Sequence, residues 1–234
     1  MGSGRLPVMF LLPKIHACDR GRTMLSAGLT GGIASGKSTV AQMLQEKGAH
    51  IIDFDTLAHS VQAPESAAWR EIVELFGREV LNSDGTIDRA KLGAVVFGDK
   101  VKLARLNSIV HPAVFREARR RIALIQEEDP GAIVLSDIPL LLEVRAWEFM
   151  DIDVIVLVYV SPDEQVQRLI KRNGCSREEA IARLSSQMPI DEKVCHADVV
   201  IDNRGSFEKT KEIVEEVWID LLERERLKRR LEAR

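Results

Sequence analysis

The chain has 234 residues, of which 45% are hydrophobic and 29% are charged, and its formal net charge is -3. That balance is typical of a globular protein with a sizeable core, formed as one domain or as a domain with insertions. Because proteins that grip a polyanion usually carry a basic excess, we expect no nucleic-acid partner.

Three cysteines without a Cys-x-x-Cys spacing indicate neither a disulfide framework nor a zinc site, and a reducing, cytoplasmic location fits them best. The apolar run Val8–Leu12 is too short for a signal-peptide core or a membrane span, so we expect no membrane insertion. Residues 1–23 show neither helical nor strand periodicity. They predict a disordered extension, a cloning remnant or a misplaced start codon, with a targeting presequence as the alternative.

Short apolar runs predict five strands in the rest of the chain. These runs are Leu25–Thr30, Ala49–Asp53, Ala132–Asp137, Val154–Val160 and Val199–Asp202. The third and fourth runs contain continuous apolar stretches without alternation, which is typical of strands buried on both faces. Since helical patterns separate the runs, the sequence predicts an α/β fold with a five-stranded parallel sheet flanked by helices.

Two helical excursions interrupt this alternation. Helical patterns occur at Trp69–Phe76, Lys91–Val96 and Val114–Ile125, without a strand signal between them. We therefore predict a helical insert at about 56–130, and a smaller excursion rich in Arg and Glu at about 168–193. Residues 24–234 would then form a single domain with both insertions, and a last helix would begin near Ser206.

A phosphate-binding loop is predicted where the first strand ends. Gly31–Ser38 reads GGIASGKS and matches G-x-x-x-x-G-K-[ST] between a strand and a helix, which argues against an incidental glycine-rich turn. Backbone N–H groups cradle phosphate oxygens in such loops, Lys37 would hold the β- and γ-phosphates, and the Ser38 hydroxyl would bind Mg²⁺. We expect ATP and Mg²⁺ as cofactors. The expected nucleotide contacts are Gly32, Ile33, Ala34, Ser35, Gly36, Lys37, Ser38 and Thr39.

An aspartate pair follows the second strand, in the sequence Ile52-Asp53-Phe54-Asp55. The carboxyl edge of a parallel sheet is where ligands bind, and residues two apart on an extended chain point to the same side. One carboxylate would accept or orient the proton of an attacking hydroxyl, while the other would position the metal shell or a neighbouring base. Capping of the following helix is the alternative role for Asp55.

Further charged groups follow the third and fourth strands. Asp137 ends the third strand, where it would hold Mg²⁺ through water or, alternatively, cap the next turn. Three arginines in the second excursion would stabilise the transferred phosphoryl group, or would make surface ion pairs with Glu178 and Glu179. These arginines are Arg168, Arg172 and Arg183.

Taken together and in order, these residues resemble the dephospho-coenzyme A kinase family from Met24 to about Asp220. The ordered set is more specific than any one motif. It comprises Gly28–Ser38, Ile52–Asp55, Phe76-Gly77, Asp84-Gly85 with Asp88-Arg89, His111-Pro112, Asp137–Glu143, and Arg168, Arg172, Arg183 and Gln187 before Asp202-Asn203. Phe54 and Leu142 depart from the family pattern, which often has a small and an aromatic residue at these places, so we expect side-chain packing to differ there.

The resemblance implies a P-loop kinase, related to nucleoside monophosphate kinases in fold, that phosphorylates the ribose 3′-hydroxyl of dephospho-coenzyme A with ATP. Asp55 would be the base, with Lys37 and Arg168 as the other catalytic residues. The helical insert would bind the acceptor, and the arginine-rich excursion would close over ATP as a lid. Arg172 and Asn203 would also contact the nucleotide, and Ser38 and Asp137 the metal. The expected acceptor contacts are Asp55, Arg89, His111, Pro139, Leu140, Arg183 and Gln187.

Some roles and functions stay open. Pro112 favours a helix start just after His111, so His111 is either catalytic or a structural residue of the insert. Arg89 would contact an acceptor phosphate or brace the insert. A shikimate- or gluconate-type kinase is an alternative enzyme, although the Gly-Gly-Gly turn of shikimate-type sites does not occur in the sequence. A GTP-dependent switch is another, but it would require an Asn-Lys-x-Asp motif that the sequence lacks. We expect a monomer or a weak homo-oligomer.

Overall fold

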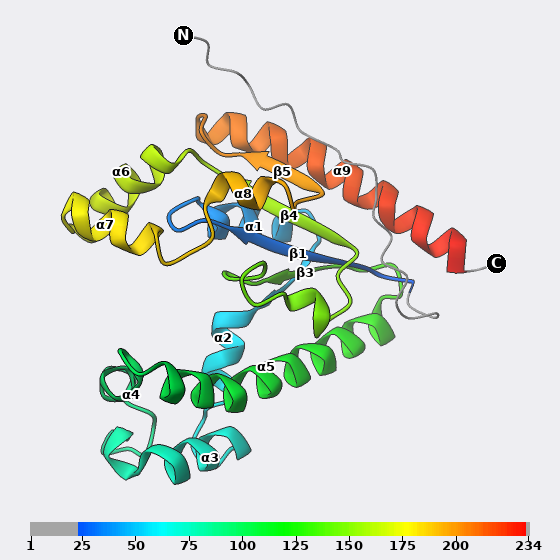
Figure 1. Ribbon diagram of the computed structural model, residues 1–234. Coiled ribbons are helices and arrows are strands. Elements are labelled where there is room, and N and C mark those ends of the chain that lie inside the picture. Colours follow the sequence, from blue (N-terminus) through cyan, green and yellow to red (C-terminus); the bar gives the residue numbers. More distant parts are fainter. Residues whose placement is uncertain (1–22, 233–234) are drawn as a thin grey trace. The chain divides into compact units, whose positions relative to one another are not determined.

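The computed structural model describes residues 23–232, so the predictions made for residues 1–22 lie outside the described residues. Within this range the five strands form one sheet in the order β2-β3-β1-β4-β5, which confirms the predicted parallel α/β class (Figure 1). The strands are β1 (Leu25–Gly31), β2 (His50–Asp53), β3 (Ile133–Asp137), β4 (Val154–Tyr159) and β5 (Val199–Asp202). No described helix is long and apolar enough to cross a membrane.

Strand β1 lies in the centre of the sheet, and all seven of its residues are buried. It pairs in parallel with β3 on one side and with β4 on the other. In this register Leu29 is paired with Asp137, and Gly31 with Val158. The end of β1 therefore enters the next loop beside the end of β3, at the carboxyl edge of the sheet.

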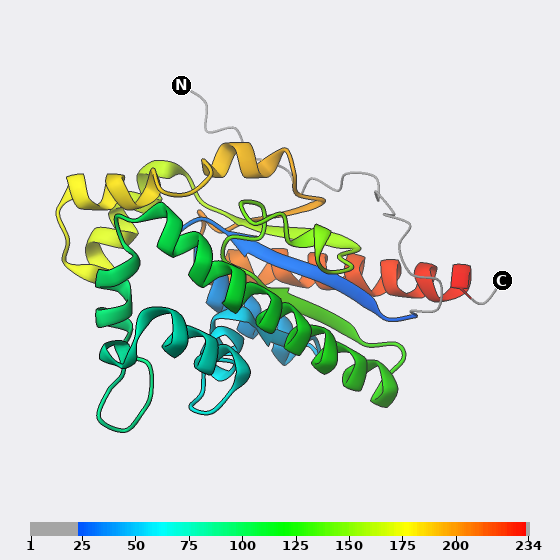
Figure 2. The same cartoon turned by 60° about the horizontal axis from the view of Figure 1, so that its bottom comes forward.

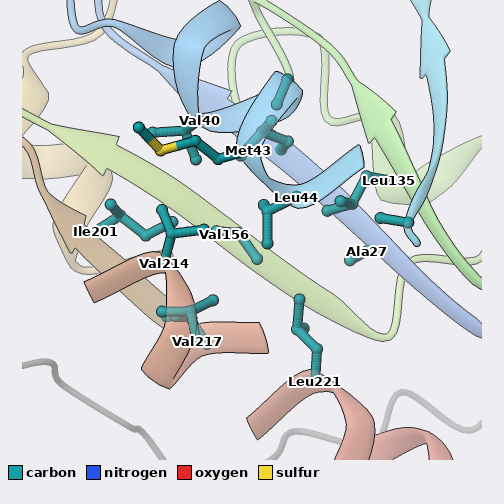
Figure 3. Close-up of a cluster of buried hydrophobic side chains, with 14 of the residues drawn as sticks. Ala27, Val40, Met43, Leu44, Leu135, Val156, Ile201, Val214, Val217 and Leu221 are labelled. Atoms are coloured by element: carbon teal, nitrogen blue, oxygen red, sulfur yellow. The ribbon is translucent and has the colours of Figure 1, made fainter. Parts of the chain in front are cut away.

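Helices cover both faces of the sheet. Helices α1 (Lys37–Glu46), α8 (Ile190–Val194) and α9 (Phe207–Glu232) pack on the sheet. Helices α6 (Pro162–Asn173) and α7 (Arg177–Leu184) pack instead against the loop after β1, and a 3₁₀ turn η2 (Ala146–Glu148) lies between β3 and β4. Val156 packs with Leu44 of α1 and Val214 of α9 (Figure 3), whereas the next strand residue, Leu157, packs with Ile190 of α8. Because successive strand residues point to opposite faces, α8 and α9 lie on opposite sides of the sheet, as Figure 2 shows.

The chain divides into two compact units. The first contains the sheet and comprises the described residues up to Ile52 and from Leu124 onwards. The second, Asp53–Ala123, contains α2 (Phe54–Ser60), α3 (Ala67–Phe76), the 3₁₀ turn η1 (Arg78–Val80), α4 (Arg89–Val96) and most of α5 (Lys100–Glu128). Its own apolar core is formed by Ile72, Phe76, Val80, Leu92 and Val96.

The prediction of a helix start just after His111 is wrong, because Pro112 lies inside the continuous helix α5. The helix begins instead behind Asp99, whose side-chain oxygen accepts hydrogen bonds from the amides of Val101 and Lys102 at 3.0 Å each. Apolar residues pack on both sides of the proline, with Val110 against the core of the second unit and Val114 buried. Packing along the helix therefore outweighs the hydrogen bond that proline cannot donate.

Candidate active site

The loop between β1 and α1 leaves main-chain amides available for a ligand. Gly36 precedes α1 with a φ of 87°, and no side chain caps this helix. The amides of Lys37 and Ser38 begin the helix, where backbone donors have no acceptor within it. A Cβ atom at residue 36 would also collide with Asn203 Nδ2, so glycine is needed for both conformation and space. The loop thus has the geometry of an anion site at a helix N-terminus.

Three amide side chains hold this loop from outside. Two glutamines hold the backbone of Ile33, in the loop between β1 and α1. The Ile33 N–H donates to Gln187 Oε1 at 3.1 Å, and the Ile33 carbonyl accepts from Gln165 Nε2 at 2.9 Å. Asn203 Nδ2 donates to the carbonyl of Ser35 at 2.7 Å. Gln187 and Asn203 were predicted as site residues, whereas Gln165 was missed. The only signal for Gln165 is a polar residue on the buried face of α6, next to Val166.

Lys37 and Asp137, both predicted at the site, form an ion pair at the carboxyl edge of the sheet. Only 17% of the Lys37 side chain and 11% of the Asp137 side chain are exposed. The ammonium group lies at the start of α1 and the carboxylate at the end of β3, so adjacent elements bring both charges beside the open amides. A positive charge therefore lies beside the start of α1, where helix amides favour anions.

The donor set also fits Mg²⁺. The exposed Ser38 follows Lys37 in the first turn of α1, and Asp137 provides a carboxylate from β3. In residues 23–232 no group of three or more His, Cys, Asp or Glu side chains could hold a metal ion. A hydroxyl and a carboxylate suit Mg²⁺, which commonly takes one or two protein oxygens and completes its shell with phosphate and water.

In the second unit the aspartate pair differs from the sequence prediction. Asp53 ends β2 and caps α2, because its Oδ1 accepts from the amides of Asp55 and Thr56 at 2.8 and 3.0 Å. Asp55 already lies in the first turn of α2, so the expectation that both residues follow one extended strand is wrong. The capping alternative for Asp55 is wrong for the same reason, and its side chain is exposed.

Comparison with known proteins agrees with this geometry. The dephospho-CoA kinase family model matches residues 25–209. The chain belongs to the dephospho-CoA kinase family. A dephospho-CoA kinase of Syntrophus aciditrophicus is 52% identical over 222 residues, which cover 95% of this chain and 94% of the relative. The family predicted from the sequence is therefore confirmed, and the chain is a kinase.

Solved structures share this fold, and one of them is a dephospho-CoA kinase. TT1252 from Thermus thermophilus is 36% identical in sequence, and its structure matches with a TM-score of 0.71. The match covers 84% of this chain and 97% of the TT1252 chain. A dephospho-CoA kinase from Campylobacter jejuni is 26% identical, with a TM-score of 0.59. The match covers 85% of this chain and 98% of the Campylobacter chain. Membership of this family leaves the shikimate- and gluconate-type kinases and the GTP-dependent switch without support.

The predicted lid arginines lie in α6 and α7. Arg168 Nη2 donates to the carbonyl of Asn203 at 2.7 Å and lies 3.9 Å from Glu164 Oε1, so it is held next to the loop. Arg172 is exposed and donates to Asn173 Oδ1 at 2.9 Å, and Arg183 is exposed in α7. Apolar residues join these helices to the phosphate loop, with Ile33 and Ala34 packed against Val166, Leu169 and Ala180.

An ion pair between Asp202 and Arg204 holds the turn that contains Asn203. Asp202 accepts two hydrogen bonds from the Arg204 guanidinium, at 2.8 and 2.6 Å. Burial alone raises the pKa of Asp202, but the hydrogen bonds from Arg204 outweigh it and the pKa is lowered. Asp202 therefore stays charged and keeps its arginine, which holds the backbone on both sides of Asn203.

The remaining predicted acceptor residues lie in both units. In the second unit Arg89 is exposed at the first position of α4, and His111 is half-buried in α5, where burial lowers its pKa. The His111 ring packs edge-on against Phe115, with centroids 6.4 Å apart. In the first unit Pro139 follows β3, its carbonyl 3.4 Å from Thr30 Oγ1, and Leu140 is exposed. Their roles remain predictions.

Proposed function

We propose that this kinase transfers the terminal phosphoryl group of ATP to the ribose 3′-hydroxyl of dephospho-CoA, the last step of coenzyme A synthesis. A bond forms between the 3′-oxygen and the γ-phosphorus, and the bond from the γ-phosphorus to the β-γ bridging oxygen breaks. ADP and coenzyme A are released. The observation that carries the proposal is the Lys37–Asp137 pair beside an uncapped loop, in a chain of this family.

The phosphate loop would bind and orient ATP. Amides at the start of α1 and the Lys37 ammonium would grip the β- and γ-phosphates, with Arg172 and Asn203 as further nucleotide contacts. Ser38 and Asp137 would hold Mg²⁺, which supplies neutralising charge on the phosphates when bound. Catalysis of this kind depends on positioning and on electrostatic stabilisation more than on covalent chemistry by the protein.

Asp55 is the proposed base. Its carboxylate is exposed and is not used as the cap of α2, so it is available to accept the proton of the 3′-hydroxyl. Arg168 would stabilise the negative charge on the transferred group from its place beside Asn203. The proposed acceptor contacts are Asp55, Arg89, His111, Pro139, Leu140, Arg183 and Gln187.

A coupled assay tests this assignment. Purified protein with ATP, Mg²⁺ and dephospho-CoA should release ADP, and mass spectrometry should find coenzyme A with one added phosphoryl group. Parallel reactions contain shikimate, gluconate or no acceptor. Release of ADP only with shikimate or gluconate would overturn the assignment, and phosphate on another hydroxyl of dephospho-CoA would overturn the 3′ position.

We propose the cytoplasm as the working location and a monomer or weak homo-oligomer as the active form, without a nucleic-acid partner. The substrates are small, diffusible molecules. Sedimentation at several protein concentrations, in parallel with activity, tests the oligomeric state, because activity confined to a tight oligomer would contradict this proposal.

A further inference from the structure

A buried lysine in α8 has no role in the proposed chemistry. Lys193 is in α8, and none of its surface is exposed. Its Nζ lies 2.8 Å from Glu143 Oε1, while the Glu143 side chain is 19% exposed. A lysine buried without a counter-charge is costly, so Glu143 is the partner that makes this burial tolerable.

The same carboxylate also holds a neighbouring segment in place. Glu143 Oε1 accepts a hydrogen bond from the amide of Met188 at 3.1 Å. The residue before Met188 is Gln187, whose side chain accepts the Ile33 N–H of the phosphate loop. Glu143 Oε1 therefore contacts both the Lys193 ammonium and the amide of Met188, the residue after Gln187.

The pair has unused hydrogen-bonding capacity. Among residues 23–232, neither Lys193 Nζ nor Glu143 Oε2 has a well-aligned hydrogen-bond partner, although both atoms are buried. Replacing a buried ion pair with neutral groups is often harmless to stability, whereas removing one partner leaves an uncompensated charge. Such a pair is weak evidence for a stabilising role, so its position next to Met188 is the more informative feature.

We propose that Lys193 and Glu143 are positioning residues for ATP binding. Lys193 keeps the Glu143 carboxylate against the Met188 amide, this bond places Gln187, and Gln187 orients the Ile33 peptide of the phosphate loop. The inference rests on the proposed nucleotide site and concerns affinity for the nucleotide, which is measured without the acceptor.

Four variants separate the positioning role from general stability. K193M leaves Glu143 without its counter-charge and should weaken ADP binding about tenfold, the typical effect of misplacing one hydrogen bond. E143Q/K193M removes both charges but retains an amide oxygen for Met188, so it should bind ADP within about twofold of the unmodified protein. E143L/K193M is equally uncharged but lacks the oxygen, and should show the tenfold loss. K193R keeps the charge and serves as the conservative control.

Binding of ADP is measured by calorimetry, and unfolding temperatures are recorded for each variant. Equal ADP affinity in E143Q/K193M and E143L/K193M would overturn the proposal, even if the unfolding temperatures differ, since that result indicates a structural role only. Adding Q187A to E143L/K193M should produce no further loss, because both changes act on the same peptide. Fully additive losses would also overturn it.

The readout separates this inference from the proposed function. ADP binding requires no acceptor, so a protein that fails to phosphorylate dephospho-CoA still reports on the Lys193–Glu143 pair. Where activity is present, the KM for ATP should rise in K193M.

Discussion

Two successive turns along the chain lead from a strand into a helix, yet their helices begin in opposite ways. Before α1 the last loop residue is Gly36, and no side chain bonds to the first amides. Before α2 the residue is Asp53, whose carboxylate occupies the amides of Asp55 and Thr56. A helix start that supplies its own acceptor is stable without a ligand, whereas one without an acceptor is available for phosphate. The comparison separates the proposed binding turn, before α1, from a structural turn, before α2.

The largest effect is expected at the binding turn, from Lys37→Ala. Loss of the ammonium that meets Asp137 should lower kcat/KM about 100- to 1,000-fold and weaken ADP binding, since one phosphate-stabilising charge is removed. Lys47→Ala is the matched control, because Lys47 follows the same helix and pairs with Glu215. Steady-state kinetics and calorimetry give both values, and unchanged kinetics in Lys37→Ala would contradict the phosphate site.

Asp55→Asn should act on the rate rather than on nucleotide binding. Without a base, kcat should fall about 100-fold or more, while ADP affinity stays near that of the unmodified protein. Asp99→Asn is the control in the same unit, because asparagine can still cap α5. A full kcat in Asp55→Asn would remove this residue from the mechanism.

Gly36→Ala tests why the binding turn needs glycine. Alanine at a φ of 87° costs about 1–2 kcal/mol, and its Cβ atom would displace Asn203, so ADP affinity should fall about tenfold. Gly98→Ala is the control, because Gly98 has a similar φ of 93° but a Cβ atom added there would have no other atom within 4 Å. That control should lose stability alone, and an equal loss of ADP affinity in both variants would contradict the contact argument.

The smallest effect is expected at the structural turn. Asp53→Ala removes the cap of α2 and should lower the free energy of unfolding by about 1 kcal/mol, with ADP affinity unchanged. Asp53→Asn retains a capping oxygen and should restore most of this stability. Urea denaturation and calorimetry provide the two readouts. If Asp53→Ala were to abolish ADP binding at full stability, the distinction between the turns would fail.

The strands and the phosphate loop were predictable because their signals are local. A buried run followed by glycines and Gly-Lys-Ser fixes strand, loop and helix within a short stretch of sequence. The placement of Asp55 was not, since periodicity does not show that β2 stops at Asp53 and a helix follows at once. The continuation of α5 through Pro112 was also missed, because it depends on packing of residues such as Val110 and Val114.

The contacts that hold the loop were hidden for another reason. Gln165 and Gln187 bond to one residue, Ile33, from positions 132 and 154 residues away in the chain. Lysine is usually exposed, so the burial of Lys193 was not expected, and its partner Glu143 lies in a different segment of the chain. Such pairings depend on tertiary structure, which a single sequence without relatives does not reveal.

The double contact at Ile33 has a mechanical consequence. Gln165 lies near the start of α6 and Gln187 follows α7, so the intervening segment is tethered at both ends to one residue, through its carbonyl and its N–H. Pivoting of that segment about the tether preserves both bonds, whereas sliding along the loop breaks at least one. A movement of α6 and α7 that keeps both bonds is therefore a swing about Ile33.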